Sequence, residues 1–157
     1  MTDQLFEISL KLIIVSETNV LCLQRWSHTG DLFWDLPGGR MQTSETDPMT
    51  CLRRETRAEV GDELSDDIFE IGSPTVVDFS VWPGAGDYSP KGIIYYALPL
   101  DVDPGKIVLS AEHARYGLLS VDELESDTEV LHGARLEPEL KECLLRIIVR
   151  LKPDAVS

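Results

Sequence analysis

The chain has 157 residues, with 28 Asp and Glu against 14 Lys and Arg, which gives a formal net charge of −14. Its length predicts one domain, residues 1–157, with room for a buried core. The charge argues against a nucleic acid polymer as partner, because such binding depends on Lys and Arg that neutralise phosphates. Small phosphate substrates stay possible, since divalent ions can supply positive charge locally.

The three cysteines are scattered and lack metal-type spacing, which indicates a reducing interior. No basic region precedes an apolar stretch after Met1, so no signal peptide is visible. The apolar run around residues 10–15 is too short to span a bilayer. We therefore expect a cytoplasmic protein without a membrane partner, as a monomer or a homodimer.

The first third of the chain predicts β-structure. Apolar runs over residues 8–15 and 20–26 predict two strands joined by a turn, and a second turn at 27–31 leads into 32–35. Residues 36–39, Leu-Pro-Gly-Gly, are expected to be irregular, because proline removes a donor and paired glycines permit tight conformations.

Residues 48–60 form the best-marked helix. Asp47 before Pro48 is typical of an N-cap followed by proline at the first helical position, and Gly61 is a natural stop. Apolar or small side chains recur at spacings of three and four and should face the core; they are Met49, Leu52, Thr56 and Val60.

Two carboxylates of this helix, Glu55 and Glu59, lie four residues apart and therefore on one helical face. They lie beside the core stripe, at the rim between helix and sheet, where both carboxylates can bind one hard cation. An ordinary solvated acidic pair is the alternative. The acidic run that follows, residues 62–70, is expected to be a surface loop.

The second half predicts two strands, 75–82 and 92–98, joined by a turn-rich connection that we expect to be mobile and functional. A short strand near 107–109 and an amphipathic helix over 137–151 follow. This order predicts an α+β fold, with helices packed on a mixed β-sheet.

Residues 38–64 resemble the signature of the Nudix (MutT-like) hydrolases. Gly39 and Glu45 match its first half, and Arg54-Glu55, Glu59 and Gly61 match its second half. Similar segments at 34–40, 109–113 and 118–124 extend the resemblance over roughly residues 8–125. The resemblance implies a Nudix-type αβα sandwich and an enzyme that hydrolyses a nucleoside diphosphate linked to another group, with Mg²⁺ or Mn²⁺ as cofactor.

The sequence departs from this signature in three ways. Eight residues separate Glu45 from Arg54 where the family has seven, which endangers the pairing of these two side chains. We place the extra residue in the loop before the helix, so the phase of the carboxylates is kept. Ala58 stands where the first glutamate of a pair is usual, and Thr56 and Asp62 replace aliphatic residues.

The resemblance assigns metal binding to Glu55 and Glu59, with the backbone carbonyl of Gly39 completing the shell. Glu112 would be a further metal ligand or the base that activates water, or a loop carboxylate without a role. Arg54 would orient the carboxylates through fork-like hydrogen bonds.

The remaining assignments concern binding and support. Arg40 would contact a substrate phosphate or be a plain surface charge, and His113 would order its loop. Gly38, Glu45 and Gly61 would be structural. Aromatic side chains that would stack on a base or fill the core are Trp34, Trp82 and Tyr88.

Nucleoside triphosphates are the favoured substrates, because the chain is compact and shows no accessory domain. Nucleotide sugars, ADP-ribose and dinucleotides stay open. The alternative is a catalytically impaired nucleotide-binding or regulatory module, which Ala58 supports and the retained Arg54 and glutamates oppose.

Overall fold

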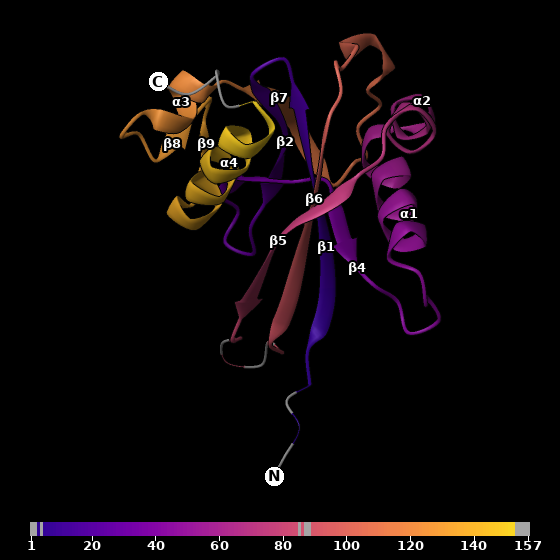
Figure 1. Cartoon of the computed structure of the whole chain (residues 1–157). Coiled ribbons are helices and arrows are strands. Elements are labelled where there is room, and N and C mark those ends of the chain that lie inside the picture. The colour runs from indigo at the N-terminus through magenta and orange to yellow at the C-terminus, as the bar shows by residue number, and fades with distance from the viewer. Residues whose placement is uncertain (1–2, 4, 85, 87–88, 153–157) are drawn as a thin grey trace.

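The computed structural model describes residues 3, 5–84, 86 and 89–152. These residues form a nine-stranded mixed sheet between two helical layers, with α1 and α2 on one side and α3 and α4 on the other (Figure 1). The predicted α+β class and the αβα sandwich are confirmed.

The strands are β1 (Glu7–Ser16), β2 (Asn19–Trp26), β3 (Leu32–Asp35), β4 (Gly38–Arg40), β5 (Thr75–Trp82), β6 (Lys91–Pro99), β7 (His113–Leu119), β8 (Val130–Leu131) and β9 (Ala134–Arg135). The helices are α1 (Pro48–Val60), α2 (Asp62–Asp66), α3 (Val121–Glu125) and α4 (Pro138–Leu151), with a π-helical turn η1 (Asp67–Ile71) and a 3-10 turn η2 (Pro104–Lys106).

The central strand β1 changes partner along its length. The strand order in the sheet is β5-β6-β1-β2-β3-β9-β8, and β7 also pairs with β2. On one edge β1 runs parallel to β6 over nine residue pairs. On its other edge it pairs with β2 at residues 15–16 and with β4 at residues 9–11, both antiparallel. This change brings the short glycine strand β4 beside the middle of the sheet.

Alternation along β1 builds one apolar core on each face of the sheet. Leu10, Leu12 and Ile14 are fully buried in the core under α1 and α2. Ile13 and Val15 are fully buried in the opposite core, which includes the apolar side of α4. Residues that alternate with the first set, including Lys11, therefore face away from α1.

Helix α1 begins and ends as the sequence predicts. The Asp47 side chain accepts a hydrogen bond from the Met49 N–H at 3.0 Å. At the other end Gly61 has a φ of 98°, which favours glycine, and its N–H bonds the Arg57 carbonyl. Both caps fix the span of the helix that carries Glu55 and Glu59.

Three predicted segments are wrong. Residues 62–70 are α2 and η1 rather than a loop, because Leu64 and Ile68 extend the apolar stripe of α1 into the same core. Residues 107–109 do not form a strand; Val108 instead donates to the Val60 carbonyl at 2.9 Å, along the end of α1. Of residues 36–39, expected to be irregular, Leu36 and Pro37 lie outside any strand, whereas Gly38 and Gly39 belong to β4, because they pair with β1.

Candidate active site

The site is built on the two glycines of β4, each of which allows a close approach. Gly38 has a φ of 136°, and a Cβ there would lie 2.0 Å from the Leu10 carbonyl oxygen. A Cβ on Gly39 would lie 2.5 Å from the Glu55 carboxyl carbon. Glycine at 38 therefore lets β4 pair with β1, and glycine at 39 lets the Glu55 carboxylate lie against the backbone.

The Glu59 carboxylate also lies against this pair of glycines. The N–H of Gly38 donates to Glu59 Oε1 at 2.9 Å. His113 Nε2 lies 3.2 Å from Glu59 Oε2 without an aligned hydrogen bond, and His113 Nδ1 lies 3.0 Å from Ser110 Oγ. Both Glu59 and His113 are buried. His113 thus lies between Ser110 of its loop and the Glu59 carboxylate.

Arg54 links the loop before α1 to Glu55. Its Nε and Nη2 donate to the two oxygens of Glu45 at 3.0 and 2.8 Å, and its Nη1 donates to Glu55 Oε1 at 2.7 Å. The expectation that the extra residue endangers the Glu45–Arg54 pairing is therefore wrong. The same loop carries a turn in which the Gln42 N–H donates to Glu45 Oε1 at 2.7 Å.

The electrostatics follow this geometry. The hydrogen bonds from Arg54, then the one from the Gln42 N–H, lower the pKa of Glu45 to about 2. The bonds to Glu45 in turn raise the pKa of Arg54. The pair is therefore ionised across the neutral range.

A cleft of about 1070 Å³ opens beside these groups. Of the residues singled out from the sequence, it brings together Trp34, Gly38, Gly39, Arg40, Glu55, Glu59, Trp82, Glu112 and His113. Glu45, Arg54 and Gly61 do not line it; they support α1 and its loop from behind. Arg40 is exposed and paired with Glu7 at 3.1 Å.

The donors present fit a small hard cation. Glu55 Oε2 is bonded by none of the described residues, whereas its Oε1 is held by Arg54. Within the described chain no three His, Cys, Asp or Glu side chains form a metal cage, and Ala58 is exposed and adds no oxygen. Mg²⁺ is usually bound through one or two carboxylates together with waters and substrate phosphates. Glu55, with Glu59 beside it, offers that kind of site.

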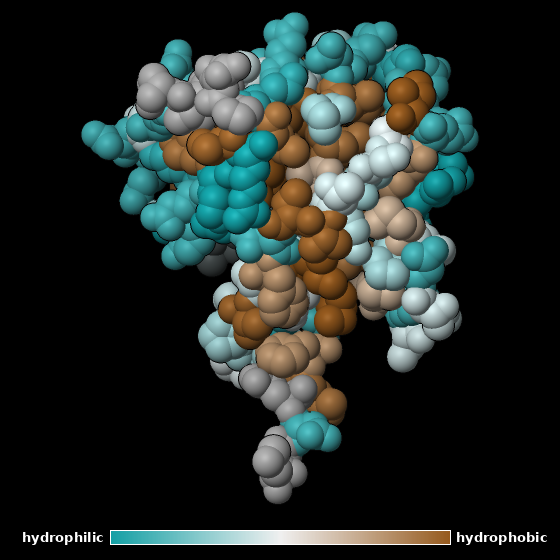
Figure 2. Space-filling view, in the orientation of Figure 1, coloured by the Kyte–Doolittle hydropathy of each residue, from teal (hydrophilic) through white to brown (hydrophobic). Residues whose placement is uncertain are grey.

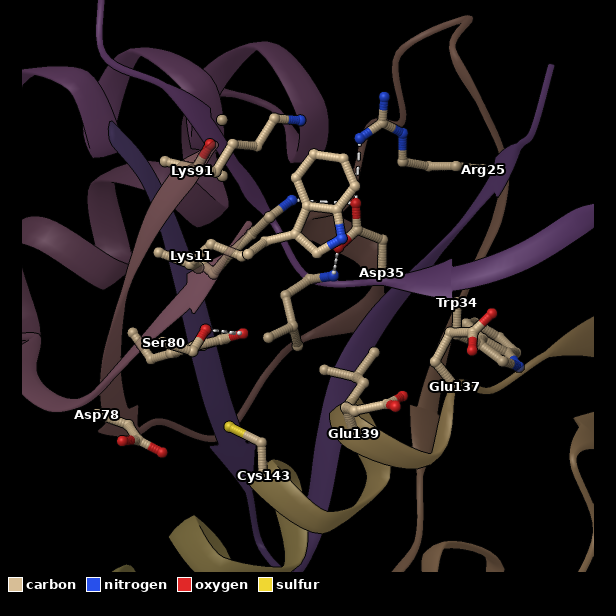
Figure 3. Close-up of a pocket in the computed structure, with 18 of the residues that line it drawn as sticks. Lys11, Arg25, Trp34, Asp35, Asp78, Ser80, Lys91, Glu137, Glu139 and Cys143 are labelled. Atoms are coloured by element: carbon tan, nitrogen blue, oxygen red, sulfur yellow. Dashed lines mark hydrogen bonds and ion pairs between the residues drawn. The ribbon is translucent and has the colours of Figure 1, made fainter. Parts of the chain in front are cut away.

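Sequence reasoning missed a cluster on the floor of the cleft, shown in Figure 3. Lys11 and Arg25 converge on one oxygen of Asp35, at 3.0 and 3.1 Å. Two further carboxylates line the cleft, Glu137 directly before α4 and Glu139 in the first turn of α4. The signal available in the sequence was Lys11 itself, a single charge inside the apolar run at residues 8–15.

The aromatic candidates fall into different environments. Trp34 is 2% exposed, and its indole N–H donates to the Leu131 carbonyl at 2.9 Å, so it belongs to the core. Trp82 lines the cleft and is 38% exposed. Tyr88 lies outside the described residues. Figure 2 shows apolar side chains gathered over β5, the strand on which Phe79 and Val81 are exposed.

None of the described helices is long and apolar enough to cross a membrane.

Comparison with protein families identifies the chain. The NUDIX domain matches residues 9–140, so the protein belongs to the Nudix hydrolase family. No curated protein matches the sequence.

Solved structures share the fold at low sequence identity. The MutT protein of Methanosarcina mazei Go1 is 20% identical, with a TM-score of 0.62, over 96% of this chain and 97% of that one. The E. coli dihydroneopterin triphosphate pyrophosphohydrolase is 19% identical, with a TM-score of 0.63, over 94% and 99%. A bifunctional NMN adenylyltransferase/ADP ribose pyrophosphatase of Francisella tularensis is 16% identical, with a TM-score of 0.67, over 96% of this chain and 42% of that one.

Proposed function

We propose that this protein is a metal-dependent pyrophosphohydrolase, which cleaves a nucleoside diphosphate linked to another group. The observation that carries the proposal is the placement of Glu55 and Glu59, one helical turn apart, against the glycine pair in the cleft. Nucleoside triphosphates are the favoured substrates. The shared fold with a dihydroneopterin triphosphate pyrophosphohydrolase supports that class, and the match to an ADP ribose pyrophosphatase keeps diphosphate-linked substrates in the panel.

Glu55, Glu59 and the Gly39 carbonyl would hold Mg²⁺ or Mn²⁺. Such an ion supplies positive charge that offsets the phosphate charge opposing an attacking water. Arg54 keeps Glu55 Oε1 in place, so Oε2 would be the oxygen available to hold the ion. The Gly38 N–H and His113 hold Glu59 in the same way. Preorganised ligands of this kind cost little reorganisation during the reaction.

Glu112 and Arg40 complete the proposed machinery from the loops. Glu112 is exposed at the cleft, next to His113, where it serves as a further ligand or as the base that accepts a proton from water. The Arg40 side chain is 63% exposed and pairs with Glu7, whose side chain is 38% exposed, so its guanidinium is accessible to a substrate phosphate that would replace Glu7.

Hydrolysis of a nucleotide panel with Mg²⁺ or Mn²⁺ tests the proposal. We expect turnover of at least one substrate, lowered about 100-fold or more in Glu55→Gln, because the amide removes the charge that holds the ion. Glu125→Gln, on the exposed part of α3 outside the cleft, is the matched control and should keep full activity. Equal loss in both variants, or none in either, would contradict the proposed role of Glu55.

The alternative function is a nucleotide-binding or regulatory module without turnover. Ala58 favours it, since this exposed position lacks the carboxylate that a second ion would use. Tight nucleotide binding by calorimetry, with no hydrolysis in either metal, would establish the module and reject the enzyme.

A further inference from the structure

The segment before β7 is bonded to the C-terminal end of α1. The last carbonyl groups of a helix have no partners within the helix. Here the Val108 N–H donates to the Val60 carbonyl at 2.9 Å, and the Ser110 N–H donates to the Glu59 carbonyl at 3.2 Å. Glycine at 61 permits this approach, because a Cβ there would lie only 3.1 Å from the Val108 Cβ. The backbone of Glu59 is therefore held by Ser110.

Ser110 also closes the turn that carries Glu112. The His113 N–H donates to the Ser110 carbonyl at 3.2 Å, which is the hydrogen bond of a β-turn over four residues. The Ser110 hydroxyl lies 3.0 Å from His113 Nδ1, so a side-chain contact spans the same turn. Glu112 is the third residue of the turn and is exposed at the cleft. Ser110 thus connects the turn of Glu112 to the helix of Glu59.

The other ring nitrogen of His113 faces the Glu59 carboxylate. His113 is 7% exposed and Glu59 is 6% exposed, so water screens this contact little. His113 Nε2 lies 3.2 Å from Glu59 Oε2, without an aligned hydrogen bond to any described residue. A neutral imidazole carries its proton on one nitrogen, and the partner of one nitrogen decides the state of the other. With the proton on Nδ1, the Nε2 lone pair would face a negative oxygen, which is unfavourable where screening is weak.

The Ser110 hydroxyl favours the opposite tautomer, because its O–H can donate to an unprotonated Nδ1. The His113 proton then lies on Nε2, and the positive end of this N–H faces Glu59 Oε2. The Gly38 N–H donates to Glu59 Oε1 at 2.9 Å. Each carboxylate oxygen of Glu59 then has one N–H beside it, and each keeps a lone pair for a further partner.

We propose that Ser110 is a positioning residue of this site, which fixes His113 as the Nε2–H tautomer and thereby orients the Glu59 carboxylate. Ser110 does not line the cleft, so it acts through these neighbours. The turn that it closes holds Glu112 at the same end of α1. The consequence for metal binding rests on the proposed function, in which Glu59 holds the ion.

Nitrogen NMR in EDTA, at mildly alkaline pH, tests the tautomer without metal or substrate. Long-range proton–nitrogen spectra distinguish the two ring nitrogens by protonation, and His113→Gln identifies the His113 signals. We expect the wild-type proton on Nε2. Ser110→Ala should move part of the population to Nδ1–H, whereas Ser110→Thr, which keeps a hydroxyl, should retain the wild-type pattern. A proton on Nδ1 in wild type, or a Ser110→Ala pattern equal to wild type, would overturn the inference.

The Gly38 amide gives a second reading in the same samples, because its N–H bonds the carboxylate of Glu59. Its chemical shift should change in Ser110→Ala and return in Ser110→Thr. Ser126→Ala is the matched control, since the Ser126 hydroxyl also bonds within a turn, to the Glu123 carbonyl at 2.7 Å, but at the end of α3. It should leave the Gly38 shift unchanged. An unchanged Gly38 shift in Ser110→Ala would contradict the orienting role.

Calorimetry with Mn²⁺ extends the test to metal binding. We expect Ser110→Ala to weaken Mn²⁺ affinity about tenfold, as is usual when a group that orients a metal ligand is lost. Ser110→Thr and Ser126→Ala should bind Mn²⁺ like wild type, and wild-type affinity in Ser110→Ala would overturn the positioning role. A wild type with the Nε2–H tautomer that binds no Mn²⁺ would reject the metal site of the proposed function. Mn²⁺-dependent hydrolysis by a wild type with the Nδ1–H tautomer would reject only this inference.

Discussion

Arg54 joins two carboxylates that have different tasks. It bonds both oxygens of Glu45, on the loop, and one oxygen of Glu55, on the helix. It also donates to the Arg40 carbonyl at 3.1 Å, so the strand that holds the glycines is tied to the same group. A fork-shaped guanidinium can do this because its donors are fixed in one plane. Glu55 is therefore positioned by the loop as well as by its own helix.

The Glu45–Arg54 pair predicts a pH-dependent stability. A folded-state pKa of about 2, below the ordinary 4.5, means that the ionised carboxylate stabilises the folded protein. This contribution is complete above about pH 4.5 and is lost as the pH falls towards 2. We expect Glu45→Gln to be less stable than wild type at pH 7, with the difference shrinking below pH 4.5. Urea unfolding at pH 7, 4 and 3 measures it, and a difference independent of pH would contradict the pairing.

Ala58 predicts that metal affinity can be raised. It lies three residues after Glu55 and is exposed, so a longer side chain has room. We expect Ala58→Glu to increase Mn²⁺ affinity about tenfold, equivalent to ~1.4 kcal/mol, by adding an oxygen ligand. Titration calorimetry measures the change, with Ala58→Gln as a control for size. Unchanged affinity would show that position 58 does not face the ion.

At the scale of elements, strand β4 contains two glycines whose effects can be tested separately, Gly38 on stability and Gly39 on metal binding. Gly38→Ala would bring Cβ against backbone, at a φ of 136°, and we expect a loss of about 2 kcal/mol or more in unfolding free energy. For Gly39→Ala the nearest atoms are those of the Glu55 carboxylate, the far end of a flexible side chain that can move aside. It should leave the unfolding midpoint nearly unchanged but weaken Mn²⁺ binding. Equal effects of both variants on stability would contradict this division.

The elements also show what local sequence can and cannot predict. Helix α1 was predictable, because Asp47, Pro48 and Gly61 act through local backbone geometry. The strand expected at 107–109 does not form, because the Val108 backbone bonds the end of α1 instead of pairing within the sheet. The Lys11–Asp35–Arg25 cluster could not be foreseen either. Its members are up to 24 residues apart, and only the strand pairing brings them together.

Across the whole molecule, one sheet is shared by two apolar cores. Residues of β1 alternate between the core under α1 and the core under α4. Detachment of either helical layer would expose one face of the same strands to water. The cleft lies across this arrangement, with carboxylates from α1 on one side and the ion-paired Lys11, Asp35 and Arg25 of the sheet on the other. Its shape thus depends on both cores being intact.

The shared sheet predicts that both cores unfold in one transition, as expected of a single domain over residues 1–157. Leu52 and Leu144 are fully buried, one in each core. We expect Leu52→Ala and Leu144→Ala each to cost about 2–5 kcal/mol, since each removes apolar contacts and leaves a cavity. Far-UV circular dichroism follows the whole backbone, and tryptophan fluorescence includes Trp34 in the core under α4. Both signals should shift together in both variants. A Leu52→Ala protein that loses part of its dichroism while its fluorescence transition stays in place would show two independent units, because the core under α1 would then unfold without the other.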